Sequence, residues 1–106
     1  METDRSEKMA EIIKRGAAEF FERESNRDAL ISITNVMVTP DGKRGVIYIT
    51  VLPESKEAGV LDFAKRKRGE LREYLFKHVR SRSLPFLDVS IDFGEKNRQH
   101  LDNILR

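Results

Sequence analysis

The sequence predicts an α+β fold built on a three-stranded mixed sheet. Three observations support this prediction. An amphipathic helical pattern opens the chain, three short segments have the β-branched or alternating pattern of strands, and a long helical stretch separates the second strand from the third. The 106 residues are 39% hydrophobic and 36% charged, which is typical of a globular protein. We therefore expect a single domain, residues 1–106, that buries its own core.

The first predicted element is a helix over residues 4–24. Its apolar residues recur at i, i+3 and i+4 spacing and so share one face: Met9, Ile12, Ile13, Ala17, Phe20 and Phe21. Gly16 lies in the interior of this helix, where glycine costs about 1 kcal/mol relative to alanine. We expect another element to pack closely against the helix at this glycine.

Two strands follow and form an antiparallel hairpin. Residues 30–39 alternate as a strand does, but the parity of the apolar residues changes partway, which indicates a β-bulge near Asn35. Residues 39–42, Thr-Pro-Asp-Gly, have the composition of a tight turn. Residues 44–52 are rich in β-branched and aromatic side chains and form the second strand. One face of this strand carries Ile47, Ile49 and Val51.

The next stretch is helical and has to bend. Pro53 ends the second strand, and Ser55 is suited to cap the helix that follows. If this helix ran straight on, its apolar stripe would pass through Lys67 and Arg68, and charged side chains are costly on a stripe that faces a core. We therefore predict a kink at Gly69 that joins two helices almost without a loop and directs the basic residues outward.

The chain then returns to the sheet. The second of the two helices covers residues 69–83, and Leu84-Pro85 ends it because the residue before a proline avoids helical angles. Its predicted core residues are Leu71, Leu75, Phe76 and Val79. Apolar and polar residues alternate strictly over 87–93, which predicts a third strand. Gly94 ends that strand, and the last residues predict a short terminal helix.

Positive charge is concentrated in residues 65–84. Eight lysines and arginines stand there against two glutamates, a formal charge of +6, whereas the whole chain carries +2 and the remainder therefore −4. A single basic element on an acidic body is typical of a polyanion-binding face. The alternative is an ordinary solvated helix face, which is the common role of such a segment.

The sequence offers little for catalysis. It has no cysteine, and His78 and His100 have neither metal-ligand nor catalytic-triad spacing. Asp88 and Asp92 share one face of the third strand and could hold a divalent ion, but alternating acids are also the ordinary solvent face of a strand. We expect no enzyme activity, no cofactor and no metal. The absence of a long apolar run predicts a cytoplasmic protein that does not enter a membrane.

The predicted order of elements is that of a type II KH domain, an RNA-binding fold. The usual KH phosphate clamp, a GXXG loop between the central helices, is absent, and Lys67-Arg68-Gly69 stands there. The sequence instead resembles the ribosome-binding factor A family, whose KH-like domain has an Ala-x-Gly kink at this point. The resemblance rests on G-x-x-R at 69–72, R-x-R-x-x-P at 80–85, T-P-D at 39–41, V-I-Y-I-T at 46–50, and Asp92.

This resemblance implies a three-stranded mixed sheet with its helices packed on one face. It also implies a factor that binds the immature small (30S) ribosomal subunit and assists the late maturation and processing of its rRNA, with a part in adaptation to cold. The expected partners are the small subunit and its rRNA, and an assembly GTPase is a further candidate. We expect the protein to act as a monomer. Lys67 departs from the family pattern, because alanine is usual at its position.

Six basic residues are the candidate RNA contacts: Lys65, Arg66, Lys67, Arg68, Arg80 and Arg82. The first four, residues 65–68, lie at the predicted kink and form what we call the elbow, where they would neutralise phosphates. Lys43 and Arg44 at the hairpin tip are candidates for a secondary contact. Arg72 falls among core residues on a helical projection, so we expect it to pair with Asp92 at the edge of the core, with RNA contact as the alternative.

The rival function is a protein-interaction module that uses the same basic helix against an acidic partner. High salt would weaken both kinds of binding. Competition with heparin or transfer RNA is therefore the measurement that separates them.

Overall fold

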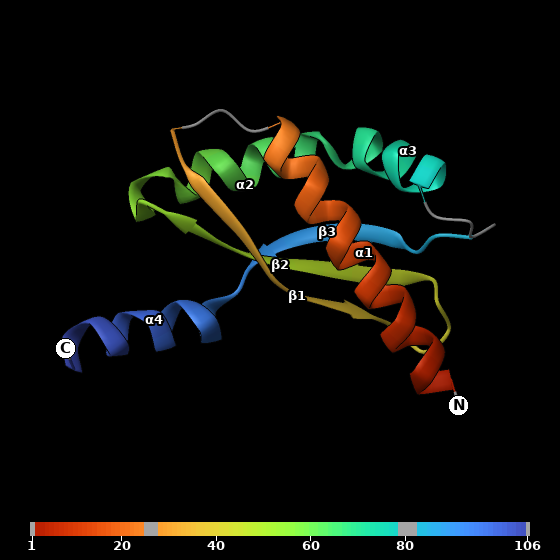
Figure 1. The fold of residues 1–106 in the computed structure, drawn as a ribbon, viewed down its shortest axis with the longest axis horizontal. Helices are drawn as coiled ribbons and strands as arrows, with labels where there is room; N and C mark the ends of the chain where they lie inside the picture. The colour runs from red at the N-terminus through yellow and green to blue at the C-terminus, as the bar shows by residue number, and fades with distance from the viewer. Residues whose placement is uncertain (1, 25–27, 79–82, 106) are drawn as a thin grey trace.

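The sheet and helices are arranged in the predicted order (Figure 1). The structure, a computed structural model, describes residues 2–24, 28–78 and 83–105. Its elements are α1 (Glu2–Glu24), β1 (Leu30–Val38), β2 (Arg44–Leu52), the 3-10 turn η1 (Glu54–Lys56), α2 (Glu57–Arg66), α3 (Arg68–His78), β3 (Phe86–Ile91) and α4 (Phe93–Leu105). Helix α1 crosses the sheet diagonally, and α2 and α3 lie end to end beside β3 (Figure 1).

The sheet is mixed, as predicted. Its strand order is β1-β2-β3, with β1 antiparallel and β3 parallel to β2. The register of the first pair shifts between Ile33 and Asn35, which confirms the predicted bulge. The turn after β1 is closed by the Gly42 N–H, which donates to the Thr39 carbonyl at 2.8 Å, and Gly42 has a φ of 73° that only glycine adopts without strain.

One continuous core lies between the sheet and the first three helices. Its buried strand residues share one parity, which places α1, α2 and α3 on the same face of the sheet, as predicted. The main contributors are Ile13, Ala17, Phe20 and Phe21 of α1, Ile47, Ile49 and Val51 of β2, Ala64 of α2, Leu71 and Leu75 of α3, and Leu87, Val89 and Ile91 of β3. Helix α4 points away from this core (Figure 1).

Close packing of another helix accounts for the glycine inside α1, as predicted. A Cβ at Gly16 would collide with the side chain of Leu75 on α3. Because protein cores are closely packed, the two helices can approach this far only where α1 has no side chain. Gly16 thus sets the position of α3, and with it the position of the basic elbow.

The bend between α2 and α3 lies at Lys67, two residues before the predicted kink at Gly69. Lys67 has a φ of −89° and a ψ of 3°, so a change in one residue's ψ is enough to bend the chain. Backbone hydrogen bonds reach Lys67 from both sides, since the Lys67 N–H donates to the Phe63 carbonyl at 3.0 Å and the Leu71 N–H donates to the Lys67 carbonyl at 2.9 Å. Gly69 lies in the first turn of α3, with nothing within 4 Å of the point where a Cβ would stand.

Smaller predictions also need correction. Ser55 does not cap α2: the helix follows a 3-10 turn, and its N-cap residue is Lys56, without a side-chain cap. Phe76 is 45% exposed rather than in the core. Phe93 is not the end of the third strand but the first residue of α4, and it is 62% exposed. The predicted core residue Val79 lies outside the described residues.

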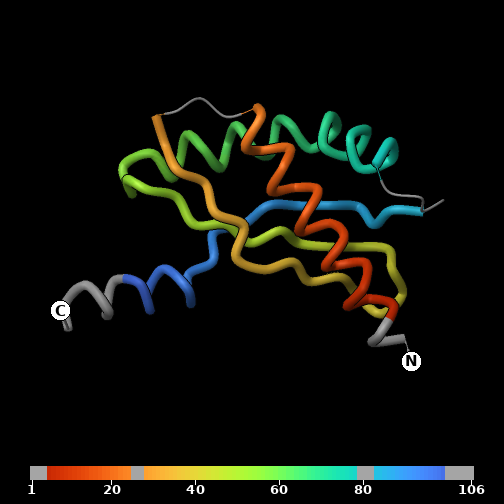
Figure 2. Tube along the Cα trace, viewed as in Figure 1, coloured from red at the N-terminus to blue at the C-terminus, as the bar shows by residue number. Residues whose placement is uncertain are grey.

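The hairpin tip lies between two other elements. The start of α1 lies beside it (Figure 2), and the Ser6 hydroxyl there donates to the Thr39 carbonyl at 3.3 Å. On the other side, the Phe86 N–H donates to the Lys43 carbonyl at 2.8 Å. The tip is therefore adjacent to the start of β3. Within the described ranges, no helix is long and apolar enough to cross a membrane.

Candidate nucleic-acid interface

A groove of about 280 Å³ lies where the elbow between α2 and α3 meets the start of β3. It is lined by Lys65, Arg68, Gly69, Arg72, Phe86 and Leu87. Three of these residues are cationic and none is acidic, so the lining is electrostatically suited to an anion. The absence of a side chain at Gly69 leaves the backbone of α3 open to close approach.

Arg68 is a cation held in place rather than a freely projecting one. Its Nε donates to the Lys65 carbonyl at 2.9 Å, and its Nη1 donates to Asp88 Oδ1 on β3 at 3.2 Å. Its guanidinium carbon lies 5.9 Å from the centroid of the Phe86 ring. Arg68 therefore fastens the end of α2 to the edge of the sheet, and the side chain remains 38% exposed toward the groove.

Arg72 does not have the partner that the sequence predicts. Its Nη1 donates to the Pro85 carbonyl at 2.7 Å and its Nη2 donates to the Leu84 carbonyl at 3.1 Å. Asp92 is out of reach because it follows the far end of β3, and a strand of six residues is about 20 Å long. Arg72 has a structural role, as expected, but its partners are backbone carbonyls and the predicted ion pair with Asp92 is wrong.

Asp92 instead caps a helix. Its Oδ1 accepts a hydrogen bond from the Glu95 N–H in the first turn of α4 at 3.0 Å, and its Oδ2 accepts one from the Thr34 hydroxyl at the bulge of β1. These hydrogen bonds, the backbone one first, hold the pKa of the Asp92 carboxyl below its ordinary value. Asp92 thus joins β1, β3 and α4.

The other elbow residues differ in their partners. Lys65 is exposed, and over the described ranges no ion-pair partner lies near it. Arg66 pairs with Asp62 at 3.3 Å, and Lys67 pairs with Glu70 at 3.2 Å. Pairs this exposed contribute little to stability, which leaves Arg66 available to other anions. Lys67 is half-buried, so among the elbow residues it departs most from the predicted outward orientation.

Arg80 and Arg82, the remaining predicted contacts, lie outside the described residues. Lys43 and Arg44, by contrast, are placed beside the groove. Arg44 is the register partner of Phe86 across the parallel pair of strands. The structure therefore brings the predicted secondary contact and the elbow to one side of the molecule, although they are far apart in the sequence.

Phe86 is a candidate functional residue that the sequence analysis missed. It opens β3 and is 65% exposed, on the parity opposite to the buried Leu87 and Val89. An aromatic residue on the solvent-facing parity of a strand is the signal that could have identified it. An exposed ring beside cationic groups can stack against a nucleobase while the cations contact phosphates.

Comparison with known proteins identifies the family of this chain. The profile of the family described as "Ribosome-binding factor A" matches residues 5–105. A "Ribosome-binding factor A" from Magnetococcus marinus is 30% identical, with 97% of this chain and 87% of the relative covered. One from Ralstonia pickettii is 34% identical, with 83% of this chain and 72% of the relative covered.

Two structures of ribosome-binding factor A are similar in fold as well. The crystal structure of ribosome-binding factor A from Thermus thermophilus has a TM-score of 0.71 and 25% identity, covering 81% of this chain and 94% of the other. A Thermus thermophilus RbfA homology model fitted into the cryo-EM map of a 30S-RbfA complex has a TM-score of 0.66 and 28% identity, covering 74% and 86%. The chain belongs to the ribosome-binding factor A family.

Proposed function

We propose that the protein binds the immature small ribosomal subunit through its rRNA and assists the late maturation and processing of that RNA. The single observation that carries this proposal is the groove at the elbow, where three cationic side chains and an exposed aromatic ring converge. Family membership supports it, as does the relative that was fitted into a 30S complex. The protein acts as a binding factor without catalysis, in the cytoplasm and as a monomer.

Each groove residue has a distinct proposed task. Lys65 contacts a phosphate, because its ammonium group is exposed and unpaired among the described residues. Arg68, already oriented by Asp88, presents its remaining donors to the same strand of RNA, and Phe86 stacks against an unpaired base. Arg72 fixes the wall of the groove. Arg80 and Arg82 extend this basic surface in our proposal, and an assembly GTPase and growth in the cold are the proposed wider context.

Lys65→Glu tests the proposal. Reversing all of the elbow charges together would be ambiguous, because Arg68→Glu would place two acids side by side and loosen the elbow. Lys65→Glu leaves every contact of the elbow in place. We expect its affinity for purified immature small subunits to fall by about tenfold, and the slope of log K against log salt to decrease by about one, as for a lost phosphate contact. Sedimentation with the subunits at several salt concentrations measures both quantities.

Lys8→Glu on the exposed face of α1 is the matched control, since it changes the net charge equally but lies in another element. Equal binding by Lys65→Glu and the wild type would refute the assignment of the groove. The rival function makes a different prediction: if the elbow binds an acidic protein, heparin or transfer RNA removes the protein from its target. Retention on small subunits in the presence of these competitors would favour the assembly factor.

A further inference from the structure

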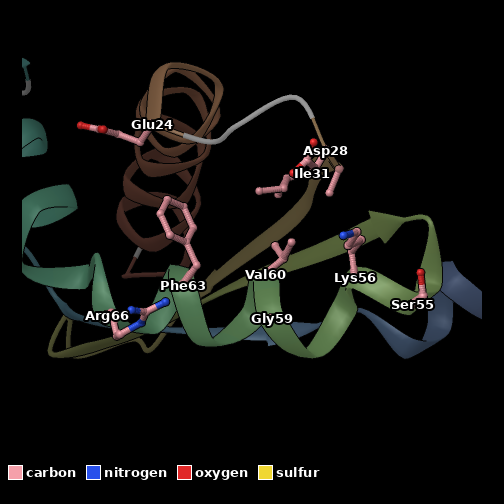
Figure 3. Close-up of a pocket in the computed structure, with 10 residues that line it drawn as sticks. Glu24, Asp28, Ile31, Ser55, Lys56, Gly59, Val60, Phe63 and Arg66 are labelled. Carbon is pink, nitrogen blue, oxygen red and sulfur yellow. The ribbon is translucent and has the colours of Figure 1, made fainter.

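The two faces of the sheet differ in what lies over them. On the face covered by helices, apolar strand residues meet apolar helix residues, and Figure 3 shows Val60 and Phe63 of α2 directed toward Ile31 on β1. Strand residues of the other parity point to the opposite face, where α1, α2 and α3 do not lie. Such a face is usually polar because water covers it. Near the hairpin tip, this open face is not polar.

The residues at that end of the open face are apolar and aromatic, and we call them the open-face patch: Met37 of β1, Val46 and Tyr48 of β2, and Phe86 of β3. Met37 is the register partner of Val46, and Phe86 pairs with the residue two positions before Val46. Met37 is 57% and Phe86 65% exposed, and the other two are half-buried. Neighbouring strands are about 4.8 Å apart, so the patch is about 10 Å wide from β1 to β3. Exposed apolar groups gathered in this way mark a binding surface.

Two acidic residues stand near the open-face patch, and the charge of each is compensated. Asp88 of β3 forms an ion pair with Arg68, whose Nη1 lies 3.2 Å from its Oδ1. Asp41, in the turn between β1 and β2, accepts hydrogen bonds from the Thr39 hydroxyl and the Lys43 N–H, and the charge of Lys43 acts on it. Neither carboxylate therefore presents an uncompensated negative charge to a ligand on the patch.

Arg44 is the uncompensated charge beside the patch. Its guanidinium has no ion pair or hydrogen bond with any residue that the structure describes. Arg44 is the register partner of Phe86, which also lines the groove at the elbow. The patch and the groove are thus continuous around the edge of β3. Aromatic and apolar side chains beside a cation are the combination that binds unpaired bases and their phosphates.

We propose that a single strand of RNA continues from the elbow groove over the open face of the sheet. Beyond the base at Phe86, a second unpaired base stacks on Tyr48, with Met37 and Val46 as the apolar floor between them and Arg44 on a phosphate. This inference rests on the proposed function, and it adds a second base-binding subsite. The bases of a duplex are paired and stacked on each other, so the open face selects unpaired RNA.

Fluorescence polarisation with the full chain tests the subsite. The probe is a fluorescein-labelled RNA of about 12 nucleotides, of mixed sequence and without self-complementarity. Met37→Glu places a negative charge on the patch at an exposed position, and we expect it to raise the Kd by about tenfold. Leu30→Glu is the matched control, because Leu30 is 61% exposed at the opposite end of the same strand. Its Kd should stay within about twofold of the wild type.

The same RNA annealed to its complement tests the preference for single strands. Binding of this duplex should be changed by less than about twofold in Met37→Glu, because paired bases do not reach the patch. Tyr48→Leu keeps apolar bulk but removes the ring, and it should weaken binding of the single-stranded probe by about fivefold. Urea denaturation of Met37→Glu, Leu30→Glu and Tyr48→Leu checks that each variant is folded.

Tyrosine fluorescence reports directly on stacking. The chain has two tyrosines and no tryptophan, so Tyr74→Phe leaves Tyr48 as the remaining tyrosine. Tyr74 lies on α3, where its hydroxyl donates to the Glu19 carboxylate at 2.9 Å in an exposed hydrogen bond. Addition of the unlabelled single-stranded RNA should quench the fluorescence of Tyr74→Phe, and the duplex should not. Quenching by stacking would not follow from a merely structural role of Tyr48.

The results that would overturn the inference are separate from those that would overturn the proposed function. Equal binding of the single-stranded probe by Met37→Glu and the wild type would refute the subsite, and weaker binding by Lys65→Glu in the same assay would leave the groove intact. If the wild type binds neither RNA, both fail. Unquenched Tyr48 in the bound complex would exclude stacking there. A dimer in analytical ultracentrifugation that Met37→Glu dissociates would make the patch an interface between copies of this chain.

Discussion

The two ends of β3 are held by opposite charges for the same physical reason. At the start of the strand, the chain arrives with backbone carbonyls that need donors, and the Arg72 guanidinium supplies two. At its end, α4 begins with backbone N–H groups that need acceptors, and the Asp92 carboxylate accepts from one of them. Both side chains supply hydrogen bonds to backbone groups, and neither serves as the partner of the other.

Some charged side chains of this protein support the fold, whereas others are available for binding. Arg72 and Arg68 are anchored to carbonyls and to Asp88, so they shape the groove before any ligand arrives. Lys65 has no such anchor among the described residues. A substitution of an anchored charge should therefore reduce the free energy of unfolding, whereas a substitution of Lys65 should reduce binding alone.

Arg72→Met should have the largest effect on stability. Methionine keeps the apolar stem of the side chain but removes both donors, leaving two carbonyls of buried residues without partners. We expect the free energy of unfolding to fall by about 3 kcal/mol. The urea midpoint at unchanged m-value measures this loss. Lys77→Met, on the exposed face of the same helix, is the control and should change stability by less than about 0.5 kcal/mol.

Asp92→Ala should have a smaller effect, because a helix cap and one side-chain hydrogen bond are lost but no buried group is orphaned. We expect a decrease of about 1–2 kcal/mol at neutral pH. The pKa of Asp92 is lower in the folded protein, so its contribution is complete above the unfolded value of about 3.9 and is lost as the pH falls through the lower folded value. The difference between wild type and Asp92→Ala should therefore shrink in acid, and a difference independent of pH would contradict the cap.

Sequence patterns predicted most of the fold because binary patterning and turn chemistry are local. The parity change near Asn35 predicted the bulge, and the cost of Gly16 predicted a close helix crossing. The kink was placed two residues late, at Gly69, because a glycine is visible in a sequence whereas a modest change of ψ at Lys67 is not.

The candidate site was less predictable, because its partners come from distant parts of the chain. The elbow was identified from its charge density, but the sequence could not show that Arg68 would reach Asp88 on β3. The pairing of Arg72 with Asp92 was inferred from the rule that buried charges have partners, and that rule does not distinguish a carboxylate from backbone carbonyls. Phe86 was missed because its exposure depends on which face of the sheet the helices leave uncovered.

A double-mutant cycle of Arg72→Met and Asp92→Ala gives the smallest expected signal. It tests most directly whether the two ends of β3 are held independently. If the two residues act at separate ends of β3, their effects on the free energy of unfolding add, and the coupling energy stays below about 0.5 kcal/mol. A direct ion pair would instead give a coupling of about 1 kcal/mol or more, since the second substitution would cost little once the first had broken the pair. Urea denaturation of the four proteins at neutral pH measures this coupling. Repeating the cycle at about pH 3, where the effect of Asp92→Ala is reduced, should leave the cost of Arg72→Met unchanged, because carbonyl acceptors do not titrate.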